Sequence, residues 1–244
     1  MNVKNVLCLC RLDMQNTPTS SIHLLTLLQL SDSALPTGAF SHSFGMESYL
    51  ESGLVHDEHS FALWLHQFLV QSLAYTDGLL LRLTFEALDE QRVIELDTLI
   101  HASALPRQLR LAAQKMGARM LAVSLAGFTT PDLQKYNEAI RAGQCIGHPA
   151  IAFALAARGA QAPIADALTS YLFSTATSLT QNAIRAIPLG QDAGQRVIRA
   201  MHETVAETVS KIFTLDDQDL GLAVPGLEIA QMRHEHQRAR MFMS

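Results

Sequence analysis

Residues 164–212 read IADALTSYLFSTATSLTQNAIRAIPLGQDAGQRVIRAMHETVAETVSKI. Apolar side chains recur there at the i, i+3, i+4 spacing of two amphipathic helices. The first face holds Ile164, Leu168, Tyr171, Leu172, Leu179, Ala183 and Ile187, and the second holds Val197, Ile198, Met201, Val205, Val209 and Ile212. Only the short break Pro188-Leu189-Gly190 separates them. We therefore predict an antiparallel helical hairpin at the centre of the core.

Other parts of the chain also carry helical signals. The same apolar spacing predicts helices over about 59–75 and 106–125. Thr130, Pro131 and Asp132 combine a cap, a first-turn proline and an acidic residue, so a helix should begin at 131 and end near Gly143. The alternation typical of strands is confined to Val6–Leu12. The fold class should be all-α.

This organisation predicts a single helical bundle domain of about eight to ten helices over residues 22–213, with irregular N- and C-terminal segments. Residues 1–21 are polar and aperiodic, and we expect a flexible segment. Residues 214–244 should form a linker and a partner-docking tail. Their apolar residues are interrupted by Arg233, Arg238 and Arg240, and a monomer offers them little cover.

Composition excludes several functions. Apolar residues make up 48% of the 244 residues and charged residues 17%, which indicates a folded protein with enough apolar surface to need a partner. A net charge of −5 disfavours nucleic acid binding. The longest uncharged runs, such as Ala167–Ile184, are rich in Ser, Thr, Gln and Asn, so no membrane span is expected. The sparse cysteines Cys8, Cys10 and Cys145 fit a cytoplasmic location.

Catalytic motifs are mostly missing. No glycine-rich turn ends in the Gly-Lys-Ser/Thr sequence that cradles nucleotide phosphates. Ser41, His42 and Ser43 allow a hydrolase hypothesis, but no Gly-x-Ser-x-Gly elbow surrounds them and no orienting acid is identified. Loop and helix-start roles are the simpler interpretation of these residues. We expect no enzyme and no cofactor.

Metal binding remains an alternative. Cys145 and His148 have a plausible ligand spacing, and His234 and His236 flank Glu235. Closed metal sites need three or four convergent ligands, whereas these are pairs. A small buried cysteine and a histidine at the Gly147–Pro149 turn are the simpler interpretation of Cys145 and His148. A direct nickel-binding carrier that uses these Cys and His ligands is therefore kept as the second hypothesis.

Four blocks together resemble the urease accessory protein UreF family. They are LQLSDSALPTGAFSHSFGME (28–47), GHPAIAF (147–153), QNAIRAIPLGQ (181–191) with Gly194-Gln195, and PGLEIA (225–230) with His234-Glu235 and Arg240-Met241-Phe242. The similarity runs from about residue 22 to 244. The sequence departs only mildly from the family's pattern, at Thr37, Ala39 and Met241.

The resemblance implies an all-α, non-catalytic co-chaperone. It further implies a homodimer that bridges UreD (also called UreH) and the GTPase UreG in the complex that inserts nickel into apo-urease. Arg240 matches an arginine near the family's C-terminus, which makes it the candidate charge-assisted contact with UreD. Phe242 is the candidate apolar anchor, with Arg238 and Met241 beside it. Arg185 is expected either to brace a helix corner or to cross a subunit contact.

Overall fold

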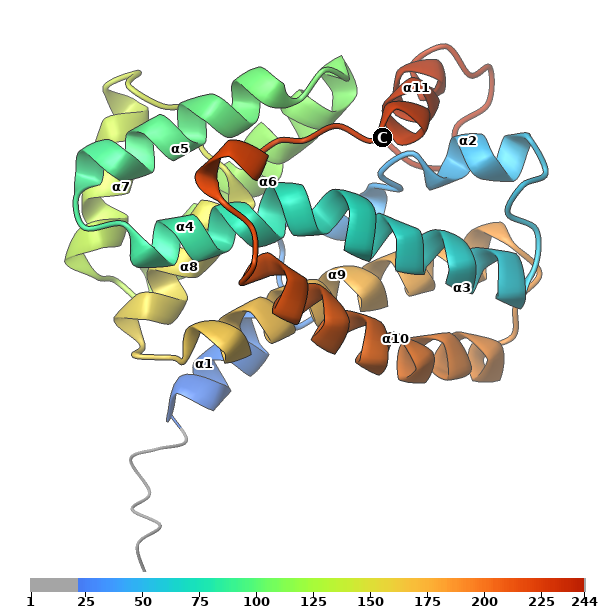
Figure 1. Cartoon of the computed structure of the whole chain (residues 1–244), viewed down its shortest axis with the longest axis horizontal. Coiled ribbons are helices and arrows are strands. Elements are labelled where there is room, and N and C mark those ends of the chain that lie inside the picture. The colour runs from blue at the N-terminus through green and yellow to red at the C-terminus, as the bar shows by residue number, and fades with distance from the viewer. Residues whose placement is uncertain (1–21, 244) are drawn as a thin grey trace, which may run out of the picture.

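The computed structural model describes residues 22–243 (Figure 1). The flexible segment predicted for residues 1–21 lies outside the described residues, as do the strand candidate Val6–Leu12 and both Cys8 and Cys10. Within residues 22–243 every regular element is a helix, which confirms the all-α fold class. No helix in this range is long and apolar enough to cross a bilayer.

The helices are α1 (Ile22–Leu30), α2 (Met46–Glu51), α3 (Glu58–Gln67), α4 (Leu79–Glu86), α5 (Glu90–Ser103), α6 (Arg107–Gly127), α7 (Pro131–Arg141), α8 (Pro149–Gly159), α9 (Ile164–Ala186), α10 (Gln191–Ile212) and α11 (Pro225–His234). Short 3₁₀ turns occur at η2 (Ala39–Ser41) and η4 (Asp217–Asp219), and a π-helical stretch, η3 (Phe68–Gly78), joins α3 to α4. Counting α3, η3 and α4 as one rod, the described residues hold ten helices, within the predicted range.

The helical hairpin that the sequence predicted is present. α9 and α10 pack against each other along their length, with a break at Ile187–Gly190. α10 also lies along α3 and η3, and α9 contacts α8 (Figure 1). Leu168 is completely buried and Val205 is 3% exposed, so the two predicted apolar faces do point into the core.

The core extends beyond the predicted hairpin to a helix that the sequence did not single out, α8. Nine of the eleven residues of α8 are buried, and this helix packs against α4, α6, α7 and α9. Its small alanines allow neighbours to approach on every side, so α8 has no polar face and no amphipathic period to reveal it. The helix expected over 59–75 is part of a longer rod that continues to Glu86, and Leu79, Leu80 and Leu81 of this continuation are all buried.

Residues 214–243 are fastened to the bundle. The guanidinium of Arg82 donates to the Leu215 carbonyl at 2.8 Å, and the Gly221 N–H donates to the Tyr75 carbonyl at 2.8 Å. Figure 1 shows this segment crossing the rod before it reaches α11. α11 then packs against α2 and α6, and the end of the chain lies close to α2 (Figure 1).

Candidate functional site

The C-terminal segment is held by one carboxylate from the start of α2. Glu47 Oε1 accepts the Met241 N–H at 2.5 Å, and Oε2 accepts the Phe242 N–H at 3.0 Å. The same Oε2 lies 2.9 Å from Nε2 of His234, whose side chain is fully buried. The other ring nitrogen of His234 faces Gln108 Oε1 on α6 at 2.8 Å. We call this arrangement the Glu47 latch.

A glycine places α2 for this role. Gly45 precedes α2 with a φ of +94°, a left-handed conformation that favours glycine. A Cβ at this position would lie 2.8 Å from the Gln231 side chain of α11. Gly45 therefore permits both the turn into α2 and the close approach of α11, which brings Glu47 under the C-terminal segment.

Arg185 closes the other side of the segment. Its Nη2 donates to the Phe40 carbonyl at 2.9 Å and to Asn182 Oδ1 at 2.5 Å, and its guanidinium lies 5.3 Å from the centre of the Phe242 ring. The Met243 N–H donates to the Ser41 carbonyl at 2.8 Å. Arg185 thus contacts its own chain at this corner, and a subunit contact by Arg185 stays a prediction.

The predicted partner-contact residues therefore fall into two groups. Phe242 is only 5% exposed, so its ring fills a site in its own chain and is not free to anchor a partner in this conformation. Met241 and Met243 point outward, with 61% and 54% of their surface exposed. Phe242 thus faces the core at a bend in the chain, while its two neighbours face solvent. The set Phe40, Arg240, Met241 and Met243 is exposed and is called the tail surface below.

Ser41 and His42 serve the loop that receives this segment. The Ser41 hydroxyl donates to the Gly38 carbonyl at 2.7 Å, and Asn182 donates to the His42 carbonyl at 2.8 Å. Burial, with a smaller contribution from the Lys115 charge, lowers the pKa of His42 to about 4. These contacts agree with loop and helix-start roles for the Ser-His-Ser sequence.

Cys145 and His148 lie in a buried loop that a carboxylate organises. Asp97 accepts the N–H groups of Ile146 and Gly147, and the Gly147 carbonyl accepts from His101. Burial raises the pKa of the Cys145 thiol to about 12. His148 caps α8 by accepting the Ala150 N–H, and burial lowers the pKa of its imidazole.

These environments suit structural roles. A thiolate is the metal-binding form of cysteine, and burial disfavours it here. Within residues 22–243 no three His, Cys, Asp or Glu side chains converge as metal ligands. His234 is turned towards Glu47 and Gln108, while His236 is exposed. The pairs singled out in the sequence therefore do not assemble into one site in this part of the chain.

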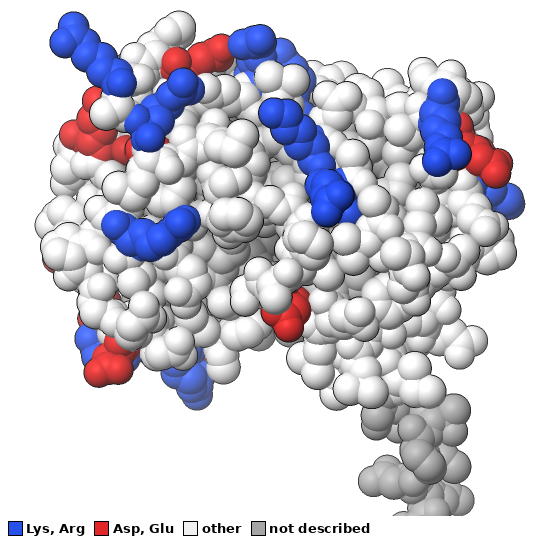
Figure 2. All heavy atoms as spheres, turned by 180° about the vertical axis from the view of Figure 1, so that it is seen from behind, with Lys and Arg blue, Asp and Glu red and all other residues white. Residues whose placement is uncertain are grey.

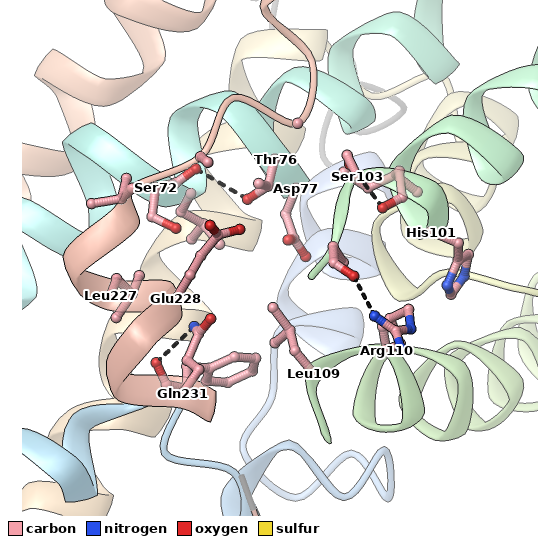
Figure 3. Close-up of a pocket in the computed structure, with 18 of the residues that line it drawn as sticks. Ser72, Thr76, Asp77, His101, Ser103, Leu109, Arg110, Leu227, Glu228 and Gln231 are labelled. Carbon is pink, nitrogen blue, oxygen red and sulfur yellow. Dashed lines mark hydrogen bonds between the residues drawn. The ribbon is translucent and has the colours of Figure 1, made fainter. Parts of the chain in front are cut away.

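A cavity between η3, α5, α6 and α11 was not anticipated from the sequence (Figure 3). Polar side chains reach its wall, but they bond to nearby carbonyl groups: Thr76 to Ser72, Ser103 to Ile100, Arg110 to Ala104, and Gln231 to Phe44. Asp77 accepts the Tyr171 phenol at 2.6 Å. These groups brace the wall, and α11 closes the cavity with Glu228, whose pKa burial raises.

Basic side chains of α6 lie beside the C-terminal segment, and one of them, Arg107, is paired with Glu235 at 2.9 Å. α6 carries Arg107, Arg110, Lys115 and Arg119 and no acidic residue. Figure 2 shows Lys and Arg side chains on the face turned away in Figure 1, separated by wide uncharged areas and with few acidic groups. Arginine is among the residues that are enriched at protein–protein interfaces. Neither the basic side chains nor the uncharged areas indicate a catalytic group.

Comparison with known proteins places the chain in a family. The family model UreF matches residues 55–202. The chain is 53% identical to a urease accessory protein UreF of Arthrobacter sp. (strain FB24), over 90% of this chain and 96% of that protein. A urease accessory protein UreF of Paenarthrobacter aurescens (strain TC1) is 52% identical, over 92% of this chain and all of that protein. One from Corynebacterium efficiens is 46% identical, over 93% and 99%.

Proposed function

The chain belongs to the UreF family of urease accessory proteins, and we propose that it is the adaptor that bridges UreD (UreH) and the GTPase UreG while nickel is inserted into apo-urease. Family membership confirms the prediction of a non-catalytic accessory protein that takes part in urease maturation. The bridging role, the homodimer and a cytoplasmic location are parts of the proposal. Binding surfaces carry this function.

Exposed apolar surface supports an adaptor role. Four residues of α1, namely Ile22, Leu24, Leu25 and Leu28, are 48–64% exposed. On the tail surface, Phe40 and Met241 are each 61% exposed. Water-exposed apolar clusters of this kind mark protein interaction sites, and an adaptor needs at least two.

The tail surface is our proposed contact with UreD. Arg240 supplies a planar group for charge-assisted hydrogen bonds to carboxylates, and the side chains of Met241 and Met243 can adapt to irregular apolar surfaces. Phe242 contributes indirectly, because its buried ring fixes the backbone between Met241 and Met243. The observation that carries the proposal is this exposed basic and apolar edge on a chain of the UreF family.

The nickel content of urease tests the proposal. Urease purified from cells that express its structural and accessory proteins should contain nickel, and omission of this chain should lower that content at least about tenfold. Full nickel content without the chain would refute a role in insertion. The activity of urease loaded by excess nickel in vitro is the control for intact apo-urease.

The carrier hypothesis has a separate test. Calorimetric titration of the purified chain with Ni²⁺ should show no tight stoichiometric site that depends on Cys145 and His148. If tight binding is present and is lost in the Cys145→Ala, His148→Ala double variant, the chain is a carrier. The buried positions of both side chains favour the adaptor.

A further inference from the structure

We propose that Glu47 is a positioning residue: its carboxylate holds the C-terminal segment in the conformation that presents Arg240, Met241 and Met243 to a partner protein. This inference deepens the proposed function and rests on it for the identity of the partner. Glu47 acts through the segment and does not itself meet the partner, because its side chain is only 13% exposed.

Three donors converge on the two oxygens of Glu47. Two of them are the backbone N–H groups of Met241 and Phe242, and the third is the His234 imidazole from the end of α11. The latch therefore joins α2, α11 and the C-terminal segment at one point. Gln108 of α6 holds the far side of the same imidazole, so a fourth element fixes its orientation.

Only a carboxylate satisfies this geometry. A glutamine at position 47 has one acceptor oxygen and one NH₂ group, which is a donor. If its oxygen faces Phe242 and His234, the NH₂ group meets the Met241 N–H. In the reverse orientation, the NH₂ group meets the Phe242 N–H. Either orientation leaves two donors opposed, and the loss of a hydrogen bond to a charged group weakens the hold on a short segment.

A held segment binds more tightly than a free one. Residues that are already ordered lose little conformational freedom on binding, so preorganisation lowers the entropic cost of association. Phe242 is packed under the guanidinium of Arg185, which leaves Met241 and Met243 on the outer side. Opening of the latch would let the segment turn over and would break up the tail surface.

The first experiment measures the latch without any partner. In the Glu47→Gln variant, the backbone amides of Met241 and Phe242 should exchange with deuterium at least about tenfold faster than in the wild type. Amides in the centres of α9 and α10 should exchange at unchanged rates. Glu58→Gln is the matched control, since it removes an equal charge from an exposed ion pair with Arg196. Unchanged exchange at Met241 and Phe242 in Glu47→Gln would overturn the proposal.

The second experiment measures whether Glu47 acts through the segment. Met241→Ala should weaken binding to purified UreD in the wild-type background, and Glu47→Gln should weaken it at least about tenfold. In the double variant Met241→Ala should add little, because a released segment no longer presents Met241. If the loss of affinity in the double variant equals the product of the two single losses, Glu47 acts independently of the segment. That result would refute the positioning role.

The two experiments separate the failure of this inference from that of the proposed function. If the wild-type chain does not bind UreD, the partner assignment is wrong, and the exchange rates alone judge the latch. If exchange rises in Glu47→Gln while UreD affinity stays the same, the latch exists but does not position a binding surface. A positioning role requires both faster exchange and weaker binding.

Discussion

The phenol of Tyr136 donates a 2.5 Å hydrogen bond to Asp97, and both side chains are buried. The Tyr136 oxygen in turn accepts the His148 N–H at 2.9 Å. Burial, together with the adjacent carboxylate, holds the pKa of Tyr136 well above its usual range, so the phenol keeps the proton that it donates. This pair fixes the loop before α8.

The loop needs that support because α6 approaches it closely. A Cβ at Gly117 would lie 2.7 Å from the Gly147 carbonyl oxygen, and Gly147 has a φ of +104°. Only glycines at both positions allow this crossing of α6 over the loop. The sequence GHPAIAF (147–153), one of the blocks that resemble the UreF family, therefore encodes a tight turn and the start of a buried helix.

Asp97→Asn should destabilise the fold strongly. Asp97 accepts three hydrogen bonds, and an asparagine leaves at least one buried donor facing its NH₂ group. The free energy of unfolding, measured with urea, should fall by about 2 to 5 kcal/mol. Asp192→Asn, at an exposed position in α10, is the matched control and should change the free energy of unfolding by less than about 1 kcal/mol. Equal stability of the two variants would contradict the bracing role of Asp97.

His42 should make stability depend on pH. Its pKa is about 4 in the folded chain, against 6.5 for the free side chain. Between these values the unfolded chain binds a proton that the folded chain does not, so the free energy of unfolding falls as the pH falls. Between pH 7 and pH 5, the free energy of unfolding of the His42→Gln variant should therefore fall by about 2 kcal/mol less than that of the wild type. Identical losses in urea unfolding of both chains would show that His42 is not buried in its neutral form.

Leu168→Ala should reveal the buried face of α9. Leu168 is completely buried, so removal of its side chain should lower the free energy of unfolding by about 2 to 5 kcal/mol. Leu88, between α4 and α5, is 99% exposed, and Leu88→Ala should change the free energy of unfolding by no more than about 0.5 kcal/mol. Thermal melts of the two variants provide the comparison. A normal melt for Leu168→Ala would place α9 outside the core.

Arg185→Ala should loosen the corner under Phe242. The variant loses the contacts with the Phe40 carbonyl, Asn182 and the Phe242 ring. We expect a loss of about 1 to 3 kcal/mol in the free energy of unfolding, and no loss with exposed Arg199→Ala. Light scattering should show an unchanged oligomeric state. A variant that melts normally but loses its dimer would assign Arg185 to a subunit contact.

Capping residues and amphipathic spacing correctly predicted the helices whose sequences contain them. Thr130 and Pro131 mark the start of α7 correctly, because capping depends on neighbouring residues. The hairpin of α9 and α10 was predicted to within a few residues, since one face of each helix is apolar. The burial of α8 was missed, because a helix that is buried almost all round has no periodic face, and the continuation of the rod to Glu86 was not predicted either.

The latch could not be predicted from the sequence. Glu47 and Met241 are 194 residues apart, and each is unremarkable in its own segment. The apolar run Met241-Phe242-Met243 did indicate a docking segment, but alternation along three residues does not show which side chain is buried. The structure shows that Phe242 docks on its own chain while its neighbours are exposed. Tertiary contacts decide that division.

Bridging is the central claim, and one pull-down tests it directly. Tagged UreD should be captured from cells that express UreD, UreG and apo-urease, with and without this chain. We predict that UreG is recovered with UreD only when this chain is present. Equal recovery of UreG without this chain would contradict the proposal that it joins the two proteins.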